Sequence, residues 1–324
     1  MSVKGVLLSR TPEGPKLLRV ATAIVPPEAA AAQRAQAIQQ VMQSLKETHE
    51  SRIITAVGGS NVVLRSVLLP KMSPQELKTA LTFEAEKYIP FKLEETILDF
   101  AIVGDRPEGR MEVLLAAARQ ELISAHLGLL QSAGVSPYAI DLEALALSNA
   151  WGLTHPKEEP LSAGADTSGL IHVGARGTIL VFLIGSQLQF TREVSLGGNT
   201  FTQAVAEGLQ LDALQAEAIK CQPGLKLAQV RAALQPAWEE WLTQCRVSFD
   251  FYENQFGHRF QRIILSGGST RLVGFKEWIL EELGIPTEEW NPMEALASDI
   301  DPKLLDSHRN DLGVAIGLAV RELL

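Results

Sequence analysis

The chain has 324 residues, of which 46% are hydrophobic and 21% charged, so it can form more than one core and is not expected to be disordered. Its formal net charge of −9 disfavours nucleic acid as a partner, because a polyanion would be held against a repulsive field. The longest apolar run, residues 179–184, is far shorter than the roughly 20 residues of a membrane-spanning helix, and residues 1–10 do not form a signal peptide, so we expect a cytoplasmic protein.

The beginning of the chain predicts a hairpin followed by a helix and a strand. Residues 3–8 and 17–25 are apolar runs on either side of a turn, which is typical of two paired strands. The Ala- and Gln-rich stretch 28–48 has helical composition with an apolar stripe. Residues 53–57 then indicate a short buried strand closed by two glycines.

Residues 62–133 predict a compact inserted subdomain of mixed α and β structure. A strand at 62–69 is followed by a helix start at Ser73, where Glu76 completes a capping box. A hairpin over residues 96–117 and a further helix complete the block.

The insertion divides the rest of the chain into two lobes. Residues 1–61 and 134–153 would form the first lobe, and residues 154–168, rich in Pro, Gly, Ser and charge, are the best candidate for a linker. Residues 169–324 would form the second lobe, which opens at 169–195 with three strands separated by glycine-containing turns.

Several element boundaries can be predicted in the remaining sequence. A strand at 135–140 should lead into a helix at 141–151, and a buried strand at 262–265 should precede a helix at 272–283. The last predicted helix covers residues 311–324.

The two lobes share an internal pattern that indicates a duplicated unit. Residues 1–20 and 177–194 both have the order strand, turn, strand. The second lobe has an additional opening strand at 170–173, which the first lobe does not match. We therefore expect the first lobe to lack its opening strand and loop.

Three glycine-rich turns, at 174–178, 196–200 and 265–270, are candidates for phosphate binding. Glycine lets backbone N–H groups approach a phosphate without a Cβ in the way, and a helix N-terminus adds partial positive charge. Each turn taken alone is more simply explained as a structural turn. The order and spacing of all three together favour a common site.

The order of several motifs is similar to that of the PilM family of type IV pilus assembly. The motifs are FEAEKYIPF, the strand–turn–strand with VGARGT, SLGGNTFTQAVAEGL, FDFYENQF, LSGGSTRLVGF, LGIPTEEWNP and VAIGLAVREL. They extend over essentially the whole chain. The resemblance implies an α/β fold of two actin-like, RNase H-like lobes that clasp ATP, with an inserted small α+β subdomain.

The resemblance also implies nucleotide-contacting positions in the second lobe. The segment 174–178 matches the second phosphate loop, 267–270 matches the adenosine loop, and the Glu217–Lys220 pair matches helix positions facing adenine and ribose. An ordinary i,i+3 contact on a helix surface remains the alternative for that pair. The candidate cofactor-binding residues, including two from the middle turn, are Gly174, Ala175, Arg176, Thr178, Gly197, Gly198, Glu217, Lys220, Gly267, Gly268, Ser269 and Thr270.

Two departures from the family pattern argue against a complete ATP site. His172 stands where the family has the Asp that holds magnesium through water, and an imidazole is a poor ligand for a cation that prefers oxygen donors. A core or rim histidine on a strand is the alternative interpretation of His172. The first phosphate loop of the family would lie before Met1. ATP is therefore a doubtful cofactor for this chain, and no metal ligand is assigned.

A partner site is implied for the inserted subdomain. In the family this subdomain borders the groove that takes the cytoplasmic N-terminal peptide of the membrane protein PilN, and an extended apolar peptide suits such a groove. The residues expected near it are Tyr88, Ile89, Pro90 and Phe91. Alternatively, these residues end a helix and pack in the core of the subdomain.

The remaining reactive residue types carry no recognisable chemistry. The six histidines are scattered without metal-ligand spacing, and no nucleophile motif occurs, so no catalytic residue is assigned. Cys221 and Cys245 are expected to be reduced core thiols.

The leading hypothesis is a cytoplasmic scaffold of pilus assembly that reaches the inner membrane through a PilN-like partner and is also capable of self-association. The alternative is an enzyme, an active ATPase or an ATP-dependent phosphotransferase. Such an enzyme would need a carboxylate side chain that binds magnesium at the position of His172. A third possibility is the cytoplasmic region of a GspL-like type II secretion protein.

Overall fold

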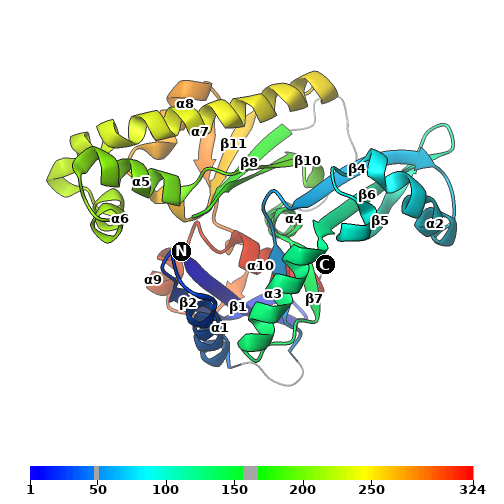
Figure 1. Cartoon of the computed structure of the whole chain (residues 1–324), viewed down its shortest axis with the longest axis horizontal. Helices are drawn as coiled ribbons and strands as arrows, with labels where there is room; N and C mark the ends of the chain where they lie inside the picture. The colour runs from blue at the N-terminus through cyan, green and yellow to red at the C-terminus, as the bar shows by residue number, and fades with distance from the viewer. Residues whose placement is uncertain (47–50, 156–166, 324) are drawn as a thin grey trace.

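The computed structural model describes residues 1–46, 51–155 and 167–323. Two lobes lie one above the other, and a smaller subdomain projects to one side of them (Figure 1). The predicted linker 154–168 falls mostly on residues outside the described ranges, while Thr167 and Ser168 already belong to a strand. Among the described residues, no helix is long and apolar enough to cross a membrane.

The second lobe is built on a five-stranded sheet in the order β10-β9-β8-β11-β12. The central strand β8 is antiparallel to β9 and parallel to β11. All of β9 and all of β8 except His172 are buried, because helices cover both faces of the sheet. The strands are β8 (Thr167–Val173), β9 (Thr178–Ile184), β10 (Gln187–Val194), β11 (Arg262–Ser266) and β12 (Thr287–Glu289).

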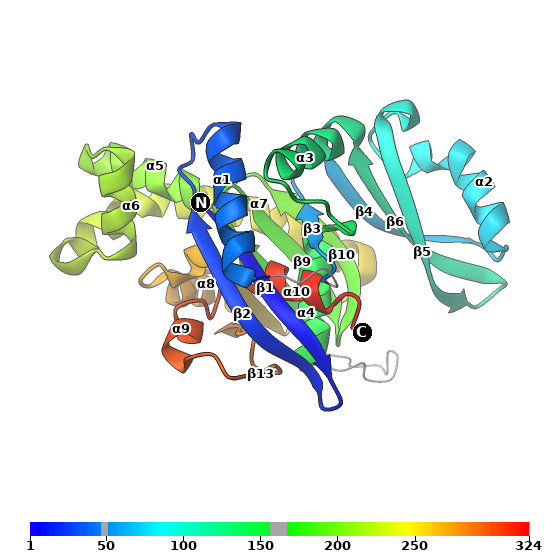
Figure 2. The ribbon, with the colours of Figure 1, turned by 90° about the horizontal axis from the view of Figure 1, so that it is seen from below.

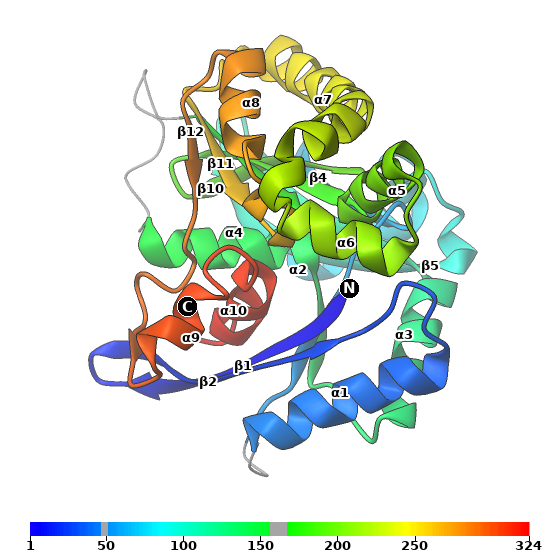
Figure 3. The ribbon, with the colours of Figure 1, turned by 90° about the vertical axis from the view of Figure 1, so that its left-hand side faces the viewer.

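Two groups of helices cover this sheet. One face packs Ile171 and Phe182 against aromatic residues of the long helix α7 and its neighbours, while the other packs Leu170 and Val181 against α4 and α10. Figure 3 shows α4 and α10 side by side between the two lobes. The helices are α4 (Glu143–Thr154), α5 (Gly198–Leu209), α6 (Ala213–Cys221), α7 (Leu227–Phe256), α8 (Phe275–Leu283), α9 (Pro302–Asp306) and α10 (Gly313–Val320).

The first lobe has two separate small sheets instead of one. The predicted hairpin is confirmed as β1 (Ser2–Thr11) and β2 (Gly14–Ile24), with β13 (Ala297–Ser298) added beside β2. The second sheet pairs β3 (Ile54–Val57) with β7 (Ala139–Leu142). The helix α1 (Ala31–Leu45) covers the hairpin in Figure 2 and also contacts α3 (Gln120–Ser132).

The subdomain is a three-stranded antiparallel sheet in the order β4-β6-β5. One face is covered by α2 (Pro74–Glu84), whose predicted capping box between Ser73 and Glu76 is confirmed. The strands are β4 (Val62–Pro70), β5 (Thr96–Arg106) and β6 (Arg110–Arg119).

Some predicted boundaries and one burial assignment are wrong. The strand expected at 135–140 begins only at Ala139, since Pro137 cannot donate to its partner strand. The helix expected from residue 272 starts at Phe275, because Gly274 adopts a left-handed conformation with φ of 83°. Cys221 is exposed at the end of α6, whereas Cys245 is buried as predicted. The final helix covers Gly313–Val320 rather than 311–324.

Candidate functional site

The three predicted glycine turns meet at the ends of β8, β10 and β11. The backbone N–H of Gly198 donates to the carbonyl of Gly174 at 2.9 Å, and that of Asn199 donates to Ala175 at 2.7 Å. The hydroxyl of Ser269 reaches the same Gly174 carbonyl at 3.4 Å. The first turn therefore contacts both of the others, as the sequence predicted.

Glycine is required at two points where these turns touch. Gly267 has a φ of 97°, and a Cβ there would overlap the Val173 carbonyl at the end of β8. A Cβ on Gly197 would lie 2.6 Å from the carbonyl oxygen of Gly174. These glycines are explained by packing of the turns, so their binding of a nucleotide stays a prediction.

Lys220 is buried beside the N-terminus of α5. Its ammonium lies 2.6 Å from the Glu217 carboxylate and donates to the Gly198 carbonyl at 3.0 Å and to the Thr202 hydroxyl at 2.7 Å. Burial opposes ionisation of Glu217, but hydrogen bonds from Lys220 and Thr202 outweigh it and hold the pKa of Glu217 below its usual value. The i,i+3 contact that the sequence offered as the alternative is present between Glu217 and Lys220. Lys220 also connects α6 to the second turn through the Gly198 carbonyl.

Charged groups from both lobes lie beside these turns. Burial lowers the pKa of the Met1 amine, with Lys220, Lys4 and Arg176 lowering it further and Glu217 opposing them. These side chains, from both lobes, therefore face one region. Two of these cations have carboxylate partners, since Lys220 pairs with Glu217 and Lys4 pairs with Asp311, so the region holds charges of both signs.

Asp311 connects the first lobe to the third turn. Its carboxylate lies 3.4 Å from the Lys4 ammonium on β1 and 2.9 Å from the Arg271 guanidinium, and it also contacts His308. The neighbouring Asn310 accepts the Gly267 N–H at 2.6 Å. The loop before α10 thus holds the third turn in place.

His172 lies at the end of β8 beside Ser266. Its Nδ1 lies 3.1 Å from the Ser266 hydroxyl, and burial, reinforced by Lys4, lowers its pKa to about 3, so the ring is neutral at physiological pH. A neutral imidazole in place of a carboxylate does not match the oxygen ligands that magnesium prefers. Within the described ranges, no three His, Cys, Asp or Glu residues cluster as metal ligands would.

Two carboxyl groups near the first turn were missed from the sequence. Glu143, in the first turn of α4, packs so closely on Gly58 that a Cβ there would lie 2.7 Å from its carboxylate. Burial raises the pKa of Glu143, while Arg176 opposes the shift. Burial and the charge of Glu143 raise the pKa of Glu193 to about 7, against a hydrogen bond from Gly59. The two carboxyl groups therefore lie near enough to influence each other electrostatically, and Arg176 lies near Glu143.

These two residues are far apart in the sequence and belong to different lobes, so spacing could not associate them. The only signals were the Gly58–Gly59 pair directly after a strand and a glutamate in the first turn of a helix.

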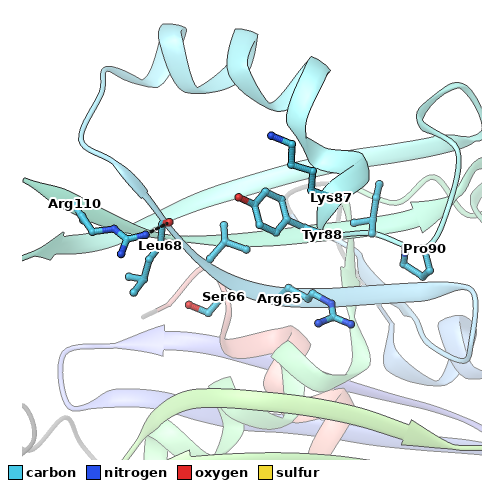
Figure 4. A pocket seen from close by; sticks show the side chains of 9 residues that line it. Arg65, Ser66, Leu68, Lys87, Tyr88, Pro90 and Arg110 are labelled. Carbon is cyan, nitrogen blue, oxygen red and sulfur yellow. Dashed lines mark hydrogen bonds between the residues drawn. The ribbon is translucent and has the colours of Figure 1, made fainter. Parts of the chain in front are cut away.

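A groove of about 730 Å³ lies in the inserted subdomain between β4 and the segment after α2. It is lined by residues 65–68, residues 87–90 and Arg110. The Tyr88 side chain projects between the two walls, as Figure 4 shows. Three of the four predicted partner residues thus lie at this groove. Phe91 does not, because it packs under the Arg119 guanidinium at 4.7 Å.

The predicted alternative, packing in the subdomain core, also holds in part. Ile89 is buried with Ala85 and Ala117, and Tyr88 packs against the core beneath α2. The groove wall is therefore fixed by the core behind it.

Comparison with known proteins gives a match over the whole chain. The family described as type IV pilus assembly protein PilM matches residues 1–323. A solved structure titled as a PilM-PilN type IV pilus biogenesis complex has 31% sequence identity and a TM-score of 0.87, covering 100% of this chain and 96% of that one.

Partial similarities to other solved structures are lower. The ethanolamine utilization protein EutJ from Carboxydothermus hydrogenoformans has 17% identity and a TM-score of 0.40, covering 59% of this chain and 60% of its own. MreB 5 of Spiroplasma citri bound to AMPPNP has 12% identity and a TM-score of 0.44, covering 64% and 65%.

Proposed function

This chain belongs to the type IV pilus assembly protein PilM family, and from this premise we propose that it is a pilus-assembly scaffold that binds the N-terminal peptide of a PilN-like membrane protein. The two-lobed α/β fold predicted from the sequence is supported by the match to that solved structure, which has a TM-score of 0.87 over the whole chain. The actin-like character of the lobes is part of the proposal. Location at the inner membrane through that partner is part of the proposal.

The observation that carries the proposal is the groove at Tyr88 and Pro90. It lies in the subdomain for which the sequence predicts a peptide site, and the matching solved structure is titled as a complex with PilN. Its walls combine an aromatic ring, apolar side chains and the backbone of a strand, which suits an extended peptide.

A role without ATP turnover is the second part of the proposal. It is supported by the neutral His172 in place of a magnesium-binding carboxylate. The converging turns, the cations around them and the carboxyl group of Glu143 favour the alternative of ATP hydrolysis. A nucleotide that binds at these turns would, on our proposal, fix the conformation of the lobes.

Calorimetric titration with a synthetic PilN-like N-terminal peptide tests the partner assignment. Tyr88→Ala should weaken binding by about 10-fold or more, since it removes a ring that projects into the groove. Tyr138→Ala is the matched control, because Tyr138 is exposed and stacks on Arg52 away from the groove. No heat from the unmodified protein at high concentration, or equal losses in both variants, would contradict the proposal.

A further inference from the structure

The two strand pairs of the first lobe match those that flank β8 in the second lobe. There, the antiparallel hairpin β9–β10 lies on one side of β8 and the parallel pair β11–β12 lies on the other. In the first lobe the hairpin β1–β2 is likewise antiparallel, and the pair β3–β7 is likewise parallel. No described strand stands between β1 and β3, so each of them ends its sheet on an unpaired edge.

Helices cover β1 and β3 together from two sides. Val6 and Leu8 of β1 pack into the cluster that includes α10, and α10 also contacts β3. On the opposite face Val3 and Leu7 pack against α1, which contacts α3, and α3 in turn contacts β3. A strand placed between the two edges would therefore be covered on both faces, as β8 is.

Burial in the two lobes differs in the way that an unfilled strand position predicts. Every residue of β9 is buried, whereas none of its counterpart β1 is, although β1 carries the apolar residues Val3, Val6, Leu7 and Leu8. In β3 only Val57 is buried. Removal of apolar surface from water is the main favourable contribution to association. The two edges therefore hold apolar surface that an added strand would bury.

The unpaired backbone groups on β1 alternate along the strand. The N–H of Val25 donates to the Met1 carbonyl oxygen at 2.9 Å, so the odd-numbered residues from Met1 to Leu7 bond to β2. The backbone groups of Lys4 and Val6 consequently point away from β2, on the side of the unpaired edge.

The edge of β3 shows the same alternation. The N–H of Tyr138, directly before β7, donates to the Ile53 carbonyl oxygen at 2.7 Å. In a parallel pair the next residue that faces β7 is Thr55, so Ile54 and Ala56 direct their N–H and C=O groups to the unpaired edge. Both edges thus present donors and acceptors at every second residue, which an extended backbone can satisfy.

We propose that the first lobe binds a donor strand, an extended apolar segment of a separate polypeptide that inserts between β1 and β3. It runs antiparallel to β1 and parallel to β3, as β8 does between β9 and β11, and joins the two small sheets into one. Backbone pairing supplies affinity. Because helices cover both faces, the side chains of the donor must be apolar on both sides, like those of β8. Met1 stays in line with β1, bonded to Val25, so the described chain does not turn back into this position.

Amide hydrogen exchange of the whole protein tests the proposal, with a synthetic peptide that copies residues 167–173, the strand β8, as the probe. Saturating peptide should slow exchange of the Lys4, Val6 and Ile54 amides by about 10-fold or more and leave that of Gly5, already bonded to β2, unchanged. The same peptide with Leu170→Asp should give no protection, because it places a charge between the covering helices. Absence of protection by the unchanged peptide, or protection of only one of the two strands, would overturn the proposal.

A fused chain distinguishes a separate donor from a linked one. In this chain a copy of residues 167–177, which are β8 and its turn, precedes Ser2, so the strand is present at a high effective concentration. We expect the same amides to be protected in the fused chain and with the free peptide. Protection in the fused chain alone would overturn the assignment to a separate polypeptide.

A matched pair of variants gives an independent test. Val6→Pro removes an N–H on the unpaired edge without removing a bond to β2, and proline is tolerated on strand edges. Val6→Ala also shortens the side chain but keeps the N–H. We expect Val6→Pro to bind the probe about 10-fold more weakly than Val6→Ala, and equal affinities would contradict the proposal.

If Val6→Pro does not fold, N-methylation of the probe replaces it. Single N-methyl groups should weaken binding at every interior position of the peptide, because successive N–H groups pair alternately with β1 and with β3. A loss at only every second position would show that the peptide pairs with a single edge, and this would contradict insertion between the two strands.

Discussion

Each lobe has a hairpin and a further strand, but only the second lobe has a described strand that joins the two into one sheet. In the second lobe, β8 joins the β9–β10 hairpin to β11 and carries the first glycine turn at its end. In the first lobe the hairpin β1–β2 and the pair β3–β7 are not joined by any described strand. None of the residues of β1 is fully buried, while all of β8 except His172 is. The central strand β8 is therefore buried within its sheet and carries a glycine turn to the site, whereas the first lobe has no such strand among the described residues.

This difference between the lobes explains why most of the candidate nucleotide site comes from the second lobe. The second lobe supplies all three converging turns and Lys220, whereas the first lobe supplies Lys4 on an edge of its hairpin and the Gly58–Gly59 turn. The proposed peptide groove depends on neither, because its walls come from the inserted subdomain. Our proposal therefore separates partner binding from the candidate nucleotide positions.

The largest effect is expected from Gly267→Ala in the complete lobe. The new methyl group would overlap the Val173 backbone, and the residue would be held at positive φ, so we expect the free energy of unfolding to fall by about 3 kcal/mol or more. The neighbouring Gly268→Ala meets no atom within 4 Å and serves as the control. Urea unfolding curves in which both variants match the parent would show that the turns do not pack as described.

A second effect concerns the carboxyl pair between the lobes. The folded-state pKa of Glu193 is raised to about 7, so its protonated form stabilises the fold at low pH, and this contribution is lost as pH rises through 7. Glu193→Gln cannot ionise, so its free energy of unfolding should not fall in this way as pH rises. It should exceed that of the parent by about 1–3 kcal/mol at pH 8 and be close to it at pH 5.

The exposed Glu240→Gln on α7 is the control for this titration. Thermal unfolding across pH should show no change of slope for it. An equal pH dependence of the parent and Glu193→Gln would contradict the raised pKa of Glu193.

The smallest effect is expected from Lys4→Met, which removes the contact of β1 with Asp311. Arg271 and His308 remain beside that carboxylate, so the loss should be only about 1 kcal/mol. Lys16→Met on the same hairpin breaks an ion pair with the 86% exposed Asp299 and should cost less than about 0.5 kcal/mol. Chemical denaturation in which Lys16→Met is the more damaging variant would contradict a structural link between the lobes at Lys4.

Much of the candidate nucleotide region could be predicted from local patterns. A strand followed by glycines identifies each turn, and the Ser73–Glu76 capping box fixes the start of α2. The electrostatic effect of Glu143 on Glu193 could not be predicted, because it depends on how α4 packs beside β10. Cys221 was misplaced because it ends its helix on the exposed side.

The central claim is that this chain binds a PilN-like peptide as a scaffold, independently of nucleotide turnover. The most direct measurement is a calorimetric titration of that peptide in ATP with magnesium and again in EDTA without nucleotide, with phosphate release followed in parallel. We predict dissociation constants within about threefold of each other and no phosphate release above background. Peptide binding that occurs only while ATP is hydrolysed, with hydrolysis abolished by Glu143→Gln, would contradict the claim.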